Sequence, residues 1–225
     1  MGTDNLFHKR KAKGNRDLER NKARRAPYAK VLVVCEGSKT EPIYFAELKD
    51  YYKINSANIT IDGSGGSSPV SVVKYARELY AREKTRGDPY DRVYCVFDKD
   101  THAGYQAALD EIAAIKRPHN IFFSINSVPC FEYWLLLHYT YTTAPFNAAG
   151  TTSACERLIS RLHEYMPEYT KATPGIFNHL IDHLETAKTH AARSLAEAEK
   201  TGTDNPMTRV HKLVDYLQNI MSIHK

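Results

Sequence analysis

Long apolar runs are absent from this 225-residue sequence, in which no run exceeds the five residues of Val31–Cys35 or Tyr133–Leu137. A membrane-spanning helix needs about 20 apolar residues, so a helical membrane protein is excluded. Glycine and proline together supply only 21 residues, which excludes collagen-like and low-complexity chains. The first residues lack the apolar segment of a secretory signal. We therefore expect a globular protein of the cytoplasm, with no membrane partner.

Cysteine is scarce, and its spacing does not suit zinc. The sequence has four cysteines, Cys35, Cys95, Cys130 and Cys155. They form no Cys-x-x-Cys pair and no histidine–cysteine cluster with the spacing of a zinc site. Cys35, Cys95 and Cys130 stand beside apolar residues, where a free thiol behaves as a small hydrophobic side chain. The sequence therefore predicts reduced cysteines and a reducing compartment.

Positive charge is concentrated at one end of the sequence. Residues 1–30 contain ten lysines and arginines but three acidic residues, whereas the whole chain has a formal net charge of +5. This segment has almost no apolar residues, so it cannot order itself alone. We expect residues 1–27 to form a basic flexible arm that neutralises nucleic-acid phosphates; a solvated tail and a nuclear-import signal are the alternatives. The residues expected to bind nucleic acid there are Lys9, Arg10, Lys11, Lys13, Arg24 and Arg25.

Strand and helix patterns alternate after residue 27. Runs rich in β-branched and aromatic residues predict strands at 31–35, 58–62, 92–98 and 121–125. Apolar stripes of helical period predict helices at about 40–52, from 69 onward, at 103–116 and at 131–138. A capping box from Ser38 to Glu41 is expected to begin the first helix, and Ser68 to cap the second. This order is typical of an α/β domain with a mostly parallel, four-stranded sheet, which we place at residues 28–145.

No strand is evident after about residue 145. Apolar stripes of helical period predict helices at about 153–165, 176–200 and 210–220, the first beginning with a capping box from Ser153 to Glu156. We expect residues 146–225 to form a helical extension packed on the α/β domain.

Three acidic residues follow the predicted strands directly. Glu36 follows the first strand, and Asp98 and Asp100 end the third. Because functional groups of parallel sheets gather outside the carboxyl ends of the strands, we expect these side chains to meet. Mg²⁺ takes one or two carboxylates, waters and substrate phosphates as ligands, so the pattern predicts a Mg²⁺ site in which Mn²⁺ can substitute.

Other residues allow two interpretations each. Glu132 is either a further metal ligand or a helix-start carboxylate that interacts with the helix dipole. Lys39 and His102 are expected to contact nucleic acid, or else to be ordinary exposed residues. Glu41 is expected to complete its capping box.

Four blocks of this sequence resemble the RloB-like family. Residues 33–45, VVCEGSKTEPIYF, match its signature V-C-E-G-x-x-T-E-x-x-Y-F. Residues 96–100 (VFDKD), 126–138 (NSVPCFEYWLLLH) and 205–214 (NPMTRVHKLV) match its other blocks, and a basic leader is usual in the family. The resemblance runs from about residue 9 to residue 217. It departs from the family pattern at Val128, where the family usually has asparagine.

The resemblance implies a fold and a chemistry. The RloB-like family is similar to the Toprim fold of topoisomerases, primases and overcoming-lysogenization-defect nucleases, a three-layer α/β domain. By that resemblance Glu36 is the general acid or base, and Asp98 and Asp100 hold the metal. Genes of the family are often linked to restriction–modification and phage-defence loci, which implies a prokaryotic defence role and a defence-system partner protein.

These observations lead to two main functional hypotheses. The first is a Mg²⁺-dependent nuclease, or a related phosphoryl-transfer enzyme, acting on DNA or RNA. The second is a non-catalytic nucleic-acid-binding or regulatory component of a defence complex, favoured by the short chain. A transferase acting on a small nucleotide is a weaker third.

Overall fold

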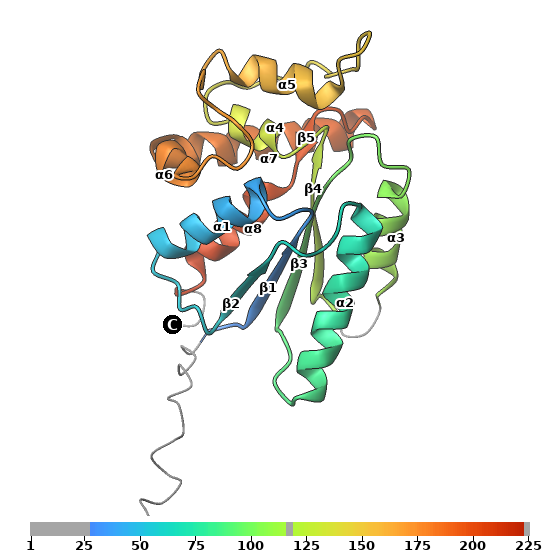
Figure 1. The fold of residues 1–225 in the computed structure, drawn as a ribbon, viewed down its shortest axis with the longest axis vertical. Helices are drawn as coiled ribbons and strands as arrows, with labels where there is room; N and C mark the ends of the chain where they lie inside the picture. Colours follow the sequence, from blue (N-terminus) through green and yellow to red (C-terminus); the bar gives the residue numbers. More distant parts are fainter. Residues whose placement is uncertain (1–27, 116–118, 223–225) are drawn as a thin grey trace, which may run out of the picture.

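The computed structural model describes residues 28–115 and 119–222, which form an α/β structure around one sheet (Figure 1). The sheet has five strands in the order β2-β1-β3-β4-β5. The strands are β1 (Val31–Cys35), β2 (Ile59–Asp62), β3 (Arg92–Asp98), β4 (Phe122–Val128) and β5 (Met207–Thr208). The first four pair in parallel, as the alternation of strands and helices predicts.

The fifth strand corrects two expectations. β5 pairs antiparallel with the end of β4, where Ser127 faces Thr208 and Val128 faces Met207. The sheet therefore has five strands and not four, and a strand does occur after residue 145. Two residues are too few to show a strand period, so no local pattern marks β5 in the sequence.

Helices cover both faces of the sheet (Figure 1). Residues of β1 alternate between two apolar clusters, because successive side chains of a strand point to opposite faces. Val31 and Val33 pack in the cluster that includes residues of α1 (Thr40–Tyr51) and α8 (Val210–Asn219). Leu32 and Val34 pack in the cluster that includes residues of α2 (Pro69–Thr85) and α3 (Tyr105–Ala114). Burial on both faces explains the uninterrupted apolar run of β1.

Two of the three predicted helix starts form as expected. The Ser68 hydroxyl accepts a hydrogen bond from the Ser71 N–H at the start of α2, and Ser153 and Glu156 form a capping box at α5 (Ala154–Leu162). The box predicted at Ser38 is wrong. α1 begins after Lys39 without a hydrogen bond from a capping side chain. Glu41 instead lines a cleft.

The segment after residue 128 supplies the remaining helices. They are α4 (Glu132–Leu136), α5, α6 (Ile176–Leu180), the short 3₁₀ helix η2 (Ile181–His183), α7 (Leu184–Thr201) and α8. The single helix expected at 176–200 is thus three consecutive segments, although no proline or glycine lies within it. Residues of α6, α7 and α8 join residues of α1 and α4 in one apolar cluster. No helix in the described ranges combines the length and apolar character needed to cross a bilayer.

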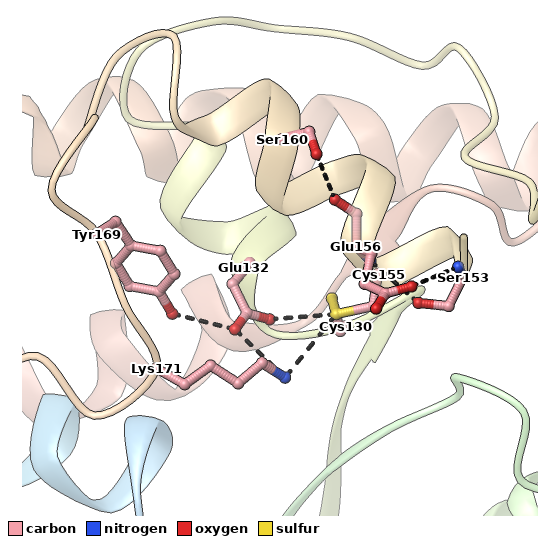
Figure 2. The surroundings of a disulfide bond; sticks show 8 residues. All are labelled: Cys130, Glu132, Ser153, Cys155, Glu156, Ser160, Tyr169 and Lys171. Atoms are coloured by element: carbon pink, nitrogen blue, oxygen red, sulfur yellow. Dashed lines mark hydrogen bonds and ion pairs between the residues drawn. A yellow bond between two sulfur atoms is a disulfide. The ribbon is translucent and has the colours of Figure 1, made fainter. Parts of the chain in front are cut away.

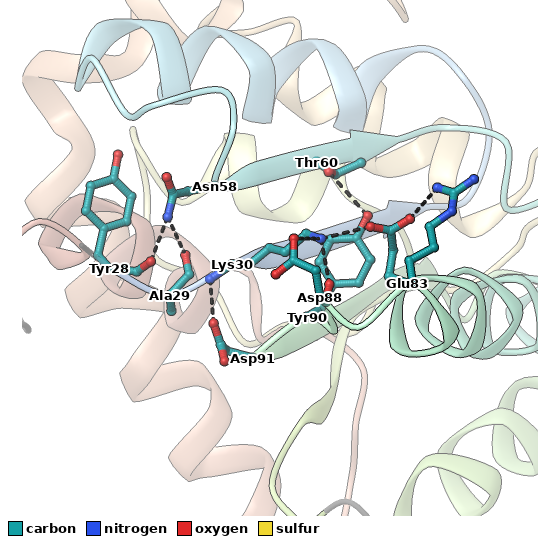
Figure 3. A network of polar contacts seen from close by, with 10 residues as sticks. Tyr28, Ala29, Lys30, Asn58, Thr60, Glu83, Asp88, Tyr90 and Asp91 are labelled. Carbon is teal, nitrogen blue, oxygen red and sulfur yellow. Dashed lines mark hydrogen bonds and ion pairs between the residues drawn. The ribbon is translucent and has the colours of Figure 1, made fainter. Parts of the chain in front are cut away.

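Lys30 is a structural residue at the start of β1 (Figure 3). Its ammonium donates to Glu83 at 2.8 Å, to Asp88 Oδ2 at 2.9 Å and to the Asp88 carbonyl at 2.7 Å, and its backbone N–H donates to Asp91. Burial by itself lowers the pKa of Lys30, but its two carboxylate partners outweigh burial and raise it. Because the side chain is buried and held by these bonds, Lys30 has a structural role.

Candidate functional site

The carboxyl ends of β1, β3 and β4 border a cleft of about 370 Å³. This is where a parallel sheet is expected to place its functional groups. Every predicted site residue in the described part of the chain lines this cleft; the six predicted arm residues, from Lys9 to Arg25, lie outside that part. The polar and sulfur-containing lining residues are Glu36, Ser38, Lys39, Thr40, Glu41, Asp98, Asp100, His102, Cys130, Glu132, Cys155 and Lys171.

Glu36 connects β1 to β3 through both of its carboxylate oxygens. Oε2 accepts a hydrogen bond of 3.1 Å from the Asp98 backbone N–H, and Oε1 lies 3.1 Å from His102 Nε2. Burial raises the pKa of Glu36 above its ordinary value, although the Asp98 N–H and His102 act in the opposite direction. A carboxyl group with a raised pKa, next to an imidazole, is suited to proton transfer.

The two aspartates predicted to share a cation differ in their surroundings. Asp98 ends β3 and is partly buried, whereas Asp100 is exposed and has a φ of +32° in the turn that follows. Burial, together with the charges of Glu41 and Glu132, raises the pKa of Asp98 well above its ordinary value. Asp98 is therefore the carboxylate that gains most from a bound cation.

Glu132 lies at the start of α4 and is only 1% exposed. Tyr169 donates a hydrogen bond of 3.0 Å from its hydroxyl to Glu132 Oε1, and Lys171 Nζ lies 3.6 Å from the same oxygen. The position in the first helical turn matches the helix-dipole interpretation, but the side chain also lines the cleft, between buried Tyr169 and exposed Lys171 (Figure 2).

Glu41 is a cleft residue that the sequence analysis assigned to a capping box. It lies in the first turn of α1 and lines the cleft with Asp98 and Glu132. Burial, reinforced by the charge of Glu132, raises the pKa of Glu41 to about 7. Its position in the first turn of the helix that follows β1 could have indicated a place in the cleft. The capping-box pattern favoured a different partner for the same side chain.

Lys171 lines the cleft from the loop between α5 and α6, and Tyr169 of the same loop bonds to Glu132 (Figure 2). Burial by itself lowers the pKa of Lys171, but the carboxylates of Glu132, Asp98 and Glu41 outweigh burial and raise it. Lys171 therefore carries a positive charge among the acidic groups at neutral pH. Sequence reasoning missed both residues, since their loop is about 70 residues away from Asp98 and has no local motif.

A glycine-containing loop supports the turn that carries Glu36. Gly37 donates its backbone N–H to the Gly66 carbonyl at 3.0 Å. A Cβ atom on Gly65 would lie 2.7 Å from the Cys35 carbonyl oxygen, so only glycine permits this close approach. Residues 63–68 thus pack behind the site and do not line the cleft.

Cys130 and Cys155 form a disulfide bond at the wall of the cleft (Figure 2). The prediction of free thiols is wrong for this pair and confirmed for Cys35 and Cys95, which are buried and free. Because these two cysteines are bonded to each other, the cysteines no longer support the prediction of a reducing compartment. Its sulfurs and a Glu132 oxygen lie within 4.8 Å of one another, but disulfide sulfurs are not thiolates, so Glu132 alone of the three offers a metal ligand.

Reducing this disulfide is expected to lower the melting temperature by roughly 10 °C. The bond joins residues 25 positions apart, and closing a loop of this size contributes about 3 kcal/mol to the free energy of unfolding. Differential scanning fluorimetry with and without dithiothreitol measures the effect. The Cys130→Ser/Cys155→Ser variant should melt like the reduced protein and not respond to reductant. An unchanged melting temperature in wild type, with four titratable thiols before reduction, would contradict the bond.

The fold and the cleft define a class of protein: an α/β protein with a carboxylate-rich cleft at the carboxyl edge of a mostly parallel sheet. A family model described as RloB-like protein matches residues 31–217, so the chain belongs to the RloB-like family. No curated protein and no solved structure matches the chain.

Proposed function

We propose that this protein is a Mg²⁺-dependent nuclease, or a related phosphoryl-transfer enzyme, that acts on nucleic acid. One observation carries the proposal. Four carboxylates from separate chain segments, Glu36, Glu41, Asp98 and Glu132, line one cleft together with the cation of Lys171. Burial, reinforced by neighbouring acids, raises the pKa values of Glu36, Glu41 and Asp98, and such a group of acids favours a bound cation.

The donor set fits Mg²⁺. The cleft offers carboxylate oxygens, and burial, reinforced by the charges of neighbouring acids, raises the pKa values of Asp98 and Glu41. Mg²⁺ prefers oxygen ligands and few carboxylates, so Asp98, with Glu132 or Asp100, is sufficient to hold it. The bound ion would neutralise the acidic cluster and polarise the phosphate that is attacked.

The remaining residues have separate roles in this proposal. Glu36, held by the Asp98 N–H and His102, transfers the proton of the attacking or leaving group. Lys171 supplies positive charge where the phosphoryl oxygens become more negative in the transition state. Lys39 and His102 at the cleft, and the basic residues of the arm, hold the phosphate backbone of the substrate.

A wider assignment follows from the family resemblance. The helices on both sides of a mostly parallel sheet are compatible with a three-layer Toprim-like domain, which we include in the proposal. We also propose a cytoplasmic role in phage defence linked to restriction–modification, together with a defence-system partner protein.

The test is cleavage by the purified full chain. Labelled single-stranded DNA, double-stranded DNA and RNA are each incubated with Mg²⁺, with Mn²⁺ and with EDTA. We expect cleavage of at least one substrate that EDTA abolishes. If none is cleaved and nucleic acid binds equally with and without EDTA, the protein is instead a non-catalytic binding component.

Replacing Lys171 separates its charge from its packing. Lys171→Met keeps the apolar stem and is expected to lower cleavage by about 100-fold, because one cation near the phosphoryl oxygens is lost. Mg²⁺ affinity, measured by calorimetry, should not fall, since the variant removes a competing cation. Lys200→Met on the exposed end of α7 serves as the control. Wild-type cleavage by Lys171→Met would exclude this role.

A further inference from the structure

Among the described residues, no strand pairs with most of the outer edge of β4. β4 pairs with β3 from Phe122 to Ser127, but on its other side β5 pairs only with Ser127 and Val128. The ladder places odd-numbered residues of β4 against β3, as the bonds from Val93 to the Ile121 carbonyl and from Lys99 to the Ser127 carbonyl show. The backbone groups of Phe122 and Ser124 therefore face away from β3, where no described strand pairs with them.

A groove of about 510 Å³ follows this open edge. Its lining includes Phe123 and Ile125, whose side chains lie on the α8 side of the sheet, and Phe122 and Ile112, which lie on the α3 side. Since side chains from both faces line one groove, the groove contains the strand edge itself. An open edge flanked by two helices is the arrangement that accepts an added β-strand from another chain.

The groove is basic. Arg92, Arg209 and Lys212 line it, against a single acid, Asp215, which already pairs with Lys188 at 2.8 Å. Arg209 lines the groove, and its buried Nε has no hydrogen-bond partner in the described part of the chain. The Arg92 guanidinium lies 4.4 Å from the Tyr216 ring centroid and 5.2 Å from that of Phe123, which adds an aromatic surface.

We propose that this groove binds an extended, acidic segment of a partner protein, which pairs with β4 as a further strand. Backbone groups of Phe122 and Ser124 supply the pairing, and carboxylates of the segment meet Arg209 and Lys212. Two other occupants fit less well. The chain's own basic residues 1–27 would repel the groove, and a second copy would bring the same three cations against themselves. The proposal is independent of the nuclease activity proposed above.

The experiment uses the full chain and synthetic seven-residue peptides in which aspartate or glutamate alternates with valine, isoleucine or tyrosine. Matched peptides with glutamine or lysine in place of the acids are the controls. We expect the acidic peptides to bind at least 10-fold more tightly than the glutamine peptides, as measured by fluorescence anisotropy. Amide hydrogen exchange by NMR should show a fast Ser124 N–H in the free protein and its protection by peptide.

Two substitutions at one position isolate the backbone contribution. Ser124→Pro removes the outward N–H of an edge strand, where proline is tolerated, and should weaken acidic-peptide binding at least 10-fold; Ser124→Ala keeps the N–H and should bind like wild type. Lys212→Glu, exposed on α8, should also weaken binding at least 10-fold and does not depend on how Ser124→Pro folds.

Four results would overturn the proposal. The first is equal binding of the acidic and the glutamine peptides. The second is equal binding of the acidic peptides by wild type and Lys212→Glu. The third is protection of the Ser124 N–H in the free protein that rises with protein concentration, which would indicate a second copy. The fourth is that oligothymidylate displaces the peptide and also binds Ser124→Pro as tightly as wild type. This result would indicate a groove for nucleic acid.

Discussion

Asp98→Asn is expected to lower Mg²⁺-dependent cleavage by at least about 1,000-fold while leaving the fold intact. Asn has the size of Asp but no charge, so the variant removes the proposed metal ligand at the end of β3 without opening a cavity. Because burial, together with the charges of Glu41 and Glu132, raises the pKa of Asp98, its charged form is unfavourable in the metal-free fold. Loss of that charge should therefore not lower the melting temperature at pH 8.

Two measurements check this expectation. Single-turnover cleavage gives the rate, and calorimetry should show a loss of Mg²⁺ affinity of at least about 10-fold. Asp182→Asn, on the exposed surface of η2, is the matched control and should cleave like wild type. Cleavage by Asp98→Asn within a few-fold of wild type would remove Asp98 from the metal site, even if wild type proves to be a nuclease.

Glu41→Gln is expected to stabilise the metal-free protein and yet to lower cleavage by about 100-fold. Burial and the charge of Glu132 raise the pKa of Glu41 from its ordinary value of 4.5 to about 7. Between these values the folded chain holds a proton that the unfolded chain has lost, so this group's contribution to stability falls as pH rises from 4.5 to 7. At pH 8 the ionised carboxylate costs at most about 3 kcal/mol, and Gln removes that cost.

The expected pattern depends on pH and on Mg²⁺. In EDTA at pH 8, Glu41→Gln should melt about 5 °C higher than wild type, and the difference should vanish near pH 4.5. Mg²⁺ should raise the melting temperature of wild type more than that of the variant, because the cation offsets the repulsion that Gln has already removed. Glu199→Gln on exposed α7 is the control. Equal or lower stability of Glu41→Gln at pH 8 would show that Glu41 is not held among other acids.

The acidic residues that follow strands were predictable. Glu36 and Asp98 come directly after uninterrupted apolar strands, and parallel strands bring their carboxyl ends to one edge. The role of Glu41 in the cleft was not predictable, because its local pattern with Ser38 also fits a capping box. The sequence does not show which groups the side chain contacts. Lys171 and Tyr169 had no pattern at all, since a loop residue becomes part of a site only through the packing of its neighbours.

The cysteines show the same limit in another way. Apolar neighbours suggested buried thiols, and this held for Cys35 and Cys95 inside strands. Cys130 also has an apolar neighbour, but the fold brings it to Cys155 of α5 at the wall of the cleft. Spacing along the chain carries no information about this distance, because the intervening loop can close in many ways.

By itself the sequence determined the four parallel strands, most helix positions and the acids at the strand ends, because β-branching, apolar period and strand-end position are properties of a few neighbouring residues. Only the tertiary structure decided the fifth strand, the approach of Lys171 and Tyr169 to Glu132, and the open edge of β4. These features depend on which distant segments bury their apolar faces against one another, and that choice is made by the whole core.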